Sequence, residues 1–97
     1  MKLTWSAFAL SDRDAIFTYI EADNPAAAVL IDERIAAGAR RLLDFPASGR
    51  LGRIAGTREL AINGTPYIAA YVVAETTVRI LRVLHGAQEW PENLPLS

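Results

Sequence analysis

The chain lacks cysteine altogether and contains a single histidine. Without cysteine it has no disulfide framework, no thiolate zinc site and no cysteine nucleophile, and one histidine supplies too few ligands for a structural metal to be expected. The sequence also has no run of about 18 apolar residues, and its opening residues hold no apolar stretch of signal-peptide length. We therefore expect a soluble, cytoplasmic protein with no metal or other cofactor and no membrane association.

Bulky apolar side chains are scarcer than the composition suggests. Hydrophobic residues occupy 52% of the 97 positions, but 17 of them are alanine, which buries little area per residue. A chain of this length forms one small domain, here residues 1–97. We expect a thin core that leans on a partner for part of its burial.

The charges are unevenly distributed, although the net charge is only −1. Residues 1–33 carry two basic and six acidic side chains, a net −4, whereas residues 40–82 carry seven arginines and three acids, a net +4. Nine of the ten basic residues are arginine, whose planar guanidinium pairs with carboxylate or phosphate through two hydrogen bonds. The second half of the chain is therefore expected to face an anionic partner, and the first half to repel nucleic acid.

The first half of the chain predicts a strand followed by two helices. Residues 2–5 form a short strand candidate, and Ser11 with Asp14 three residues later has the spacing of an acidic capping box, which opens a helix. Asn24-Pro25 supplies an N-cap and a first-turn proline for a second helix, which Phe45-Pro46 stops. The short link between the two predicts an antiparallel helix hairpin.

The second half predicts strands. Residues 46–56 hold three glycines, one proline and two arginines, and are expected to form a mobile basic connector. Three β segments follow at 57–62, 66–74 and 77–85, separated by loops whose lengths suit hairpins. The order β-α-α-β-β-β predicts an α+β domain in which the helix hairpin packs on one face of an antiparallel sheet.

The loop lengths predict a register in which residue 62 pairs with 66 and residue 74 with 77. One face of the sheet then carries Leu60, Ile68 and Val83 and is expected to be the core beneath the helices. The other face is the candidate functional surface, because it carries two tyrosines and a pair of opposite charges; its rows are Thr57-Tyr71-Ile80, Glu59-Ala69-Arg82 and Ala61-Tyr67-Leu84.

An ordered set of short motifs spans nearly the whole chain. They are Trp5 with the helix after it, Asn24-Pro25-Ala26-Ala27, Phe45-Pro46 to Gly49-Arg50, Gly56-Thr57-Arg58-Glu59-Leu60, Pro66-Tyr67-Ile68, Arg82-Val83-Leu84-His85-Gly86-Ala87-Gln88 and Trp90-Pro91. In this order and spacing the set resembles the RelE/ParE toxins of type II toxin–antitoxin modules. The resemblance implies a β-α-α-β-β-β toxin that arrests growth and forms a hetero-oligomer with a small cognate antitoxin, which neutralises it.

The resemblance covers two kinds of target. RelE-like members cut mRNA in the ribosomal A site without a metal, whereas ParE-like members poison DNA gyrase. Here His85 matches a histidine of the nucleases, but Gly86 follows it where a tyrosine is expected, and Tyr67 replaces the arginine of the middle strand. These departures favour gyrase as the target. The alternatives are a ribosome-dependent mRNA endonuclease and a non-toxic binding module with the same fold.

Three residues are candidates for catalysis if the protein is an RNase, namely His85, Glu59 and Arg82. Metal-free RNA cleavage needs a base, an acid and cations around one phosphate. Each candidate also has a structural interpretation. Glu59 and Arg82 have the placement of a cross-strand ion pair, and His85 that of a hydrogen-bonded residue at the end of a strand.

Contacts with an anionic target or partner are expected from six residues of the second half: Arg50, Arg53, Arg58, Tyr67, Tyr71 and Arg79. The two connector arginines stand out because a flexible loop needs glycine but not charge. The tyrosines suit stacking on bases or on an antitoxin, and equally packing against a neighbouring strand. The antitoxin is expected to be acidic where it crosses this half, with an amphipathic helix over the helix hairpin and a strand or extended tail along the sheet.

Overall fold

The computed structural model describes residues 1–95 of the chain. Its sheet has the strand order β1-β5-β4-β3-β2 and is antiparallel except that β1 runs parallel to β5. The elements in chain order are β1 (Lys2–Trp5), α1 (Ala7–Glu21), α2 (Pro25–Arg41), β2 (Arg50–Leu51), β3 (Arg58–Ala61), β4 (Tyr67–Val73) and β5 (Thr77–His85).

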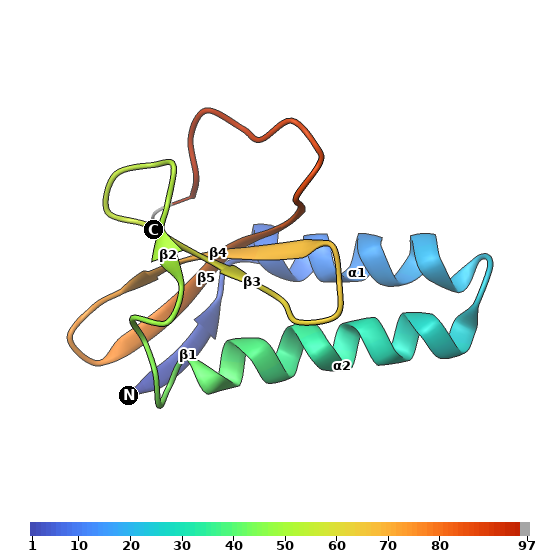
Figure 1. Ribbon diagram of the computed structural model, residues 1–97, viewed down its shortest axis with the longest axis horizontal. Helices are drawn as coiled ribbons and strands as arrows, with labels where there is room; N and C mark the ends of the chain where they lie inside the picture. Colours follow the sequence, from blue (N-terminus) through green and yellow to red (C-terminus); the bar gives the residue numbers. More distant parts are fainter. Residues whose placement is uncertain (96–97) are drawn as a thin grey trace.

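The two helices lie together as a hairpin, and the C-terminal tail lies across the sheet from α2 (Figure 1). The predicted α+β fold with a helix hairpin on a sheet is therefore confirmed, with one short strand and one parallel pair added. In the part of the chain that the structure describes, neither helix combines the length and apolar character needed to cross a membrane.

Helix α1 begins earlier than the capping-box spacing predicted. Its N-cap is Ser6, whose hydroxyl accepts a hydrogen bond from the Ala9 N–H (3.0 Å) and donates one to the Leu81 carbonyl of β5 (2.7 Å). The predicted start at Ser11 is wrong, because the hydroxyl that directly follows β1 caps the helix and joins it to the sheet at once.

Helix α2 begins as predicted, with Asn24 as N-cap and Pro25 in the first turn. The helix itself ends at Arg41, and hydrogen-bonded turns carry the chain on to Phe45. The predicted stop therefore lies one turn beyond the end of the helix.

The segment 46–56, predicted as a connector, contributes a short strand to the edge of the sheet. Arg50 and Leu51 form β2, which pairs antiparallel with the start of β3. The Arg58 guanidinium donates to the Gly49 carbonyl (2.7 Å), and the Gly52 N–H donates to the Thr57 carbonyl (2.8 Å). Backbone pairing and an arginine side chain therefore fix the segment at both ends.

The β3–β4 hairpin differs from the predicted register by one residue. Ile62 donates its N–H to the carbonyl of Tyr67 (2.9 Å), not to that of Pro66. Because Pro66 has no N–H to give to a strand ladder, the loop has four residues, and Gly64 within it adopts a φ of +74°. The predicted pairing of residues 74 and 77 is confirmed, since the Ala74 N–H donates to the Thr77 carbonyl (2.8 Å).

A β-bulge in β5 shifts the register a second time. Tyr71 pairs with Ile80, but its neighbour Ala70 pairs with Arg82, so that Leu81 is the extra residue. The two shifts move Tyr67 and Tyr71 to the face that packs under the helices, and Ile68 to the opposite face. The predicted assignment of these three residues is wrong, whereas Leu60 and Val83 belong to the helix-facing core as predicted.

Two apolar clusters lie on opposite faces of the sheet. The larger one, beneath the helices, contains Ala9, Ile35, Ala39, Leu42, Ile62, Tyr67, Ala69, Tyr71, Val78, Ile80 and Val83. The smaller one is formed where the tail and the loop after β2 cover the helix-free face, and it contains Ala70, Leu81 and Leu94, with Ile54, Val72 and Trp90 packed around them. Alanines occupy several central positions, which makes the core as thin as the composition predicted.

Candidate functional site

A buried carboxylate organises the two arginines that the sequence singled out. Glu59, on β3, is only 3% exposed, and its side chain accepts hydrogen bonds from the Arg50 guanidinium (2.9 Å) and from both the backbone (2.8 Å) and the guanidinium (3.1 and 3.2 Å) of Arg53. The arginine side chains remain 65% and 44% exposed. The cluster thus presents two guanidinium groups toward solvent but only one net positive charge.

The electrostatics of this cluster keep Glu59 ionised. Burial by itself raises the pKa of the carboxyl, but the hydrogen bonds from the side chain and backbone of Arg53 and from Arg50 lower it by more, so that the pKa is about 2 in place of the ordinary 4.5. Glu59 is therefore a very weak base, and the two arginines are held in fixed positions.

Arg82 is paired with α1 and not with Glu59, although both residues flank Ala70 in the sheet. Its guanidinium makes a two-pronged ion pair with Asp12 (2.7 and 2.9 Å), and the same carboxylate accepts the Val83 N–H (2.9 Å). Hydrogen bonding to Asp12 raises the pKa of the Arg82 guanidinium. The predicted cross-strand pair of Glu59 and Arg82 is wrong, because each side chain has other partners: Glu59 binds Arg50 and Arg53, and Arg82 binds Asp12.

His85 ends β5 and contacts one of the two predicted surface tyrosines. Its Nδ1 accepts the Ala87 N–H (3.0 Å), and its ring packs edge-on against that of Tyr67, with centroids 5.5 Å apart. Tyr67 is only 9% exposed. This geometry matches the structural interpretation of a strand-end histidine.

Tyr71 is fully buried. Its hydroxyl donates to the Pro46 carbonyl (2.8 Å) and accepts the Gly49 N–H (2.9 Å), and burial raises the pKa of this phenol. Neither Tyr71 nor Tyr67 forms the exposed stacking surface that the predicted register gave them, because both lie beneath the helices.

The two remaining candidate arginines are also engaged with the fold. Arg58 donates to the carbonyls of Gly49 (2.7 Å) and Ala47 (3.3 Å), beside the Glu59 cluster. Arg79 donates to the Thr4 hydroxyl of β1 (3.2 Å), on the far side of the sheet. The structure thus brings Arg50, Arg53 and Arg58 to one edge and leaves Arg79 apart from them.

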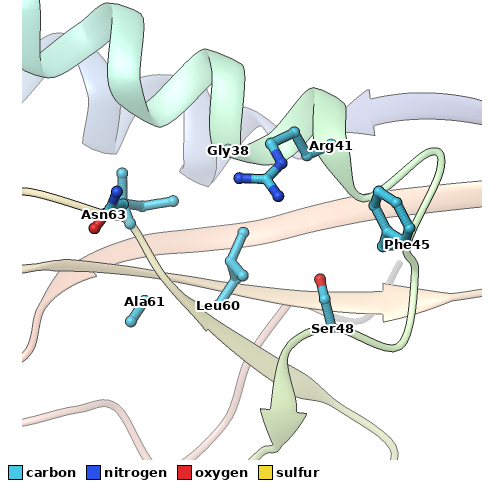
Figure 2. A pocket seen from close by; sticks show the side chains of 8 residues that line it. Gly38, Arg41, Phe45, Ser48, Leu60, Ala61 and Asn63 are labelled. Carbon is cyan, nitrogen blue, oxygen red and sulfur yellow. The ribbon is translucent and has the colours of Figure 1, made fainter.

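A groove of about 180 Å³ lies between the end of α2 and β3. Because β2 pairs only with Arg58 and Glu59, the next residues of β3 have β4 on one side and, among residues 1–95, no strand on the other. Figure 2 shows Arg41 reaching from the helix into this space toward Leu60. The groove is lined by Gly38, Arg41, Phe45, Ser48, Leu60, Ala61, Ile62 and Asn63.

The groove was not among the predicted sites, although the sequence contains one signal for it. Gly38 interrupts an otherwise alanine-rich helix, and a Cβ added there would lie 3.0 Å from Ile62 Cδ1. The glycine therefore permits the close approach of α2 to β3 that forms the floor of the groove.

Comparison with known proteins assigns the family. A family model described as the ParE toxin of type II toxin–antitoxin system, parDE, matches residues 3–90. The chain belongs to the ParE toxin family. As a toxin of a type II toxin–antitoxin system, it has an antitoxin as its partner.

Relatives of this ParE-family toxin agree with that assignment. "Putative toxin Y4kP" of Sinorhizobium fredii is 43% identical over 93 residues, which is 96% of each chain. "Toxin RelE2" of Caulobacter vibrioides is 37% identical over 87 residues, 90% of this chain and 97% of that one. Among solved structures, a chain of the chromosomal ParDE toxin–antitoxin system from P. aeruginosa superposes with a TM-score of 0.80 at 26% identity, covering 88% of this chain and 95% of that chain.

The ParE-family toxin also exposes large apolar side chains along its helix hairpin. These side chains are 47–78% exposed, and they are Phe8, Leu10, Tyr19, Val29 and Leu30. A thin, alanine-rich core with apolar residues left outside is the condition in which a partner adds burial. Together with the groove, the hairpin gives the toxin two surfaces suited to a protein partner.

Proposed function

We propose that this ParE-family toxin arrests growth by binding DNA gyrase and inhibiting it, without chemistry of its own. The observation that carries the proposal is that the three side chains available for metal-free RNA cleavage are each committed to the fold. Glu59 is buried between two arginines, Arg82 is bound to Asp12, and His85 accepts a backbone N–H. Such cleavage requires a base and cations that converge on one phosphate.

The experiment compares the two targets directly. Supercoiling by purified gyrase is measured with and without the toxin, and mRNA integrity is followed in a translation extract that receives the same preparation. We expect supercoiling to fall and the mRNA to remain intact. Toxin mixed beforehand with its cognate antitoxin is the control and should leave supercoiling normal. Unchanged supercoiling together with cleaved mRNA would overturn the proposal.

An mRNA endonuclease remains the second candidate, and two observations favour it. A relative that is 37% identical is named "Toxin RelE2", and His85 lies at the end of β5, where its ring is half-buried. Under this alternative, His85→Ala should abolish mRNA cleavage while the protein stays folded. Under the gyrase proposal, the same variant should inhibit supercoiling about as well as the unchanged toxin.

We further propose that the antitoxin covers both surfaces described above. An amphipathic helix suits the apolar side chains of the helix hairpin, and an extended segment suits the groove beside β3, where Arg41 offers a charge and the strand edge offers backbone groups. A second arginine of α2, Arg34, lines an adjoining pocket that shares Gly38, Arg41 and Asn63 with the groove. The segment is therefore acidic as well as apolar.

A further inference from the structure

The C-terminal tail and the loop after β2 cover the helix-free face of the sheet together (Figure 1). From this side Trp90 and Leu94 of the tail, with Ile54 of the loop, pack on Ala70 and Leu81. The two covering segments are more than thirty residues apart in the chain. They also meet where the Arg53 guanidinium carbon lies 3.7 Å from the centroid of the Trp90 ring.

The tail is fixed by hydrogen bonds at its beginning. The Gly86 N–H donates to the Pro66 carbonyl (2.8 Å), and His85 and Gln88 exchange hydrogen bonds in a turn (2.8 and 3.1 Å). Beyond Gln88, packing of Trp90 and Leu94 holds the described part of the tail to the sheet. Residues 89–95 are thus anchored at one end and held by side chains along the rest.

Packing of the tail on the sheet buries one polar group that has no hydrogen-bond partner. The Nε1 of Trp90 is buried and has no hydrogen-bond partner among the described residues. When the tail lies on the sheet, this indole N–H has lost its water and gained no acceptor, which costs free energy. If the tail moves away from the sheet, water can bind the N–H again. The unpaired N–H therefore offsets part of the free energy that the apolar packing of the tail contributes.

Stacking of Arg53 on the Trp90 ring stabilises the packed tail, and Glu59 holds the Arg53 guanidinium in the orientation for stacking. The edge of the guanidinium bonds the buried carboxylate through Nε and Nη2, while its flat face stacks on the indole. The Arg53 backbone N–H bonds the same carboxylate. Arg50 shares the Glu59 carboxylate but does not stack on the tail, and this difference supplies a matched control.

We propose that residues 89–95 form a strap that opens from the helix-free face as a unit while the core stays folded, with Arg53, oriented by Glu59, as its latch. Opening uncovers Ala70 and Leu81, which are completely buried when the strap is closed. The strap is defined by contacts within the chain, and its existence does not depend on which target the toxin binds.

The absence of cysteine allows a direct test with single-thiol variants. Ala69 and Ala70 are neighbours on β4, both completely buried, but Ala69 faces the helices and Ala70 the strap. The full chain carrying Ala70→Cys or Ala69→Cys is treated with a thiol-specific reagent under native conditions, and the rate of modification is measured. We expect the thiol at position 70 to react at least about tenfold faster than the one at 69, because local opening needs less free energy than global unfolding.

The latch is tested in the same two backgrounds. Arg53→Ala removes both the stacking on Trp90 and an ion-pair partner of Glu59, so it should raise the rate at position 70 about tenfold more than the rate at 69, as expected for loss of a desolvated cation–π contact. Arg50→Ala removes an ion-pair partner of Glu59 but no stacking on the tail, so it should change the two rates by the same factor. Thermal melting checks that each variant is folded, and Ala39→Cys, which is equally buried on the core-facing side of α2, replaces Ala69→Cys if that variant does not fold. Equal rates at the two positions, or an Arg53→Ala effect of the same size at both, would overturn the proposal.

Discussion

Glu59 is a charged side chain that is almost fully buried, and its neighbours explain why the fold tolerates it. Removing a carboxylate from water is costly unless hydrogen bonds and opposite charge replace the lost solvation. Here Arg50 and the side chain and backbone of Arg53 supply both. The two arginines that the sequence predicted as free anion ligands are consequently also the counter-ions of a buried acid.

The pKa of Glu59 predicts how stability depends on pH. Since the pKa is about 2 in the folded protein and 4.5 ordinarily, the unfolded chain takes up the proton first as the pH falls, so the contribution of Glu59 is complete above about pH 4.5 and is lost toward pH 2. We expect Glu59→Gln to lower the free energy of unfolding by on the order of 2–3 kcal/mol at neutral pH. Urea denaturation across this pH range should show the difference shrinking, and a difference independent of pH would contradict the assignment.

Tyr71 yields a second prediction at this scale. Tyr71→Phe keeps the buried ring but removes the hydroxyl that joins Pro46 and Gly49, and an unpaired buried N–H or carbonyl costs about 1–3 kcal/mol. Thermal or urea unfolding measures this loss. Because the side chain is completely buried, toxicity per folded molecule should be unchanged. If the Tyr71→Phe protein is folded but not toxic, the Tyr71 hydroxyl has a role in target binding as the sequence predicted.

At the scale of elements, α1 completes the edge of β5 where β1 ends. β1 pairs with β5 only as far as Trp5; beyond it the Ser6 hydroxyl bonds the Leu81 carbonyl, and the Asp12 carboxylate accepts the Val83 N–H. Helix side chains thereby replace a neighbouring strand. We call this contact between α1 and β5, made by Ser6 and Asp12, the α1–β5 seam. The bulge at Leu81 lies within it.

The seam gives different expectations for its two charged residues. Asp12→Ala removes the acceptor of the Val83 N–H and also leaves Arg82 without its acid, whereas Arg82→Ala leaves the Val83 hydrogen bond in place. We expect Asp12→Ala to destabilise by about 1 kcal/mol more than Arg82→Ala. Chemical denaturation of the two variants side by side measures the difference. A larger effect of Arg82→Ala would mean that the arginine has a role in the fold beyond this pair.

Elements whose signals are local were predictable from the sequence. Asn24-Pro25 marks the start of α2, and the two-residue loop before Thr77 fixes its hairpin. The parts that failed depend on partners far away in the chain. The carboxylate of Asp12 and the guanidinium of Arg82 are seventy positions apart, and no local pattern predicts either this pair or the bulge in β5. The candidate site was misplaced for the same reason, because one slipped register exchanges the two faces of a strand.

For the whole molecule, part of the positive charge of the second half gathers beside the groove and around Glu59. The net +4 of residues 40–82 includes Arg41, which lines the groove, and the arginines around Glu59. Arg40 and Arg41 are adjacent and both exposed at the end of α2, but only Arg41 lines the groove. They form a matched pair for testing where the antitoxin binds.

We expect Arg41→Glu to weaken the complex with the antitoxin about tenfold at low salt, and Arg40→Glu about twofold, because only Arg41 lines the groove and would lie within short range of a segment bound there. The difference should narrow at high salt. Affinities are measured by calorimetry or surface plasmon resonance at two ionic strengths. Equal effects of the two reversals would remove the groove from the antitoxin's binding site.

The parallel pairing of β1 with β5 also determines when this toxin can be completed during its own synthesis. Lys2 pairs with Thr77 and Trp5 with Ile80. The first strand to be synthesised, β1, therefore has no partner until the last strand, β5, has been synthesised. At a translation rate of about 5–20 residues per second, roughly 4–15 seconds separate the two, and contacts this distant in sequence form slowly. Through that interval α1 also lacks the Leu81 carbonyl and the Val83 N–H that it binds in the finished protein. The nascent chain therefore cannot add β1 to the sheet, or give α1 these two partners, until β5 has been made at the end of translation.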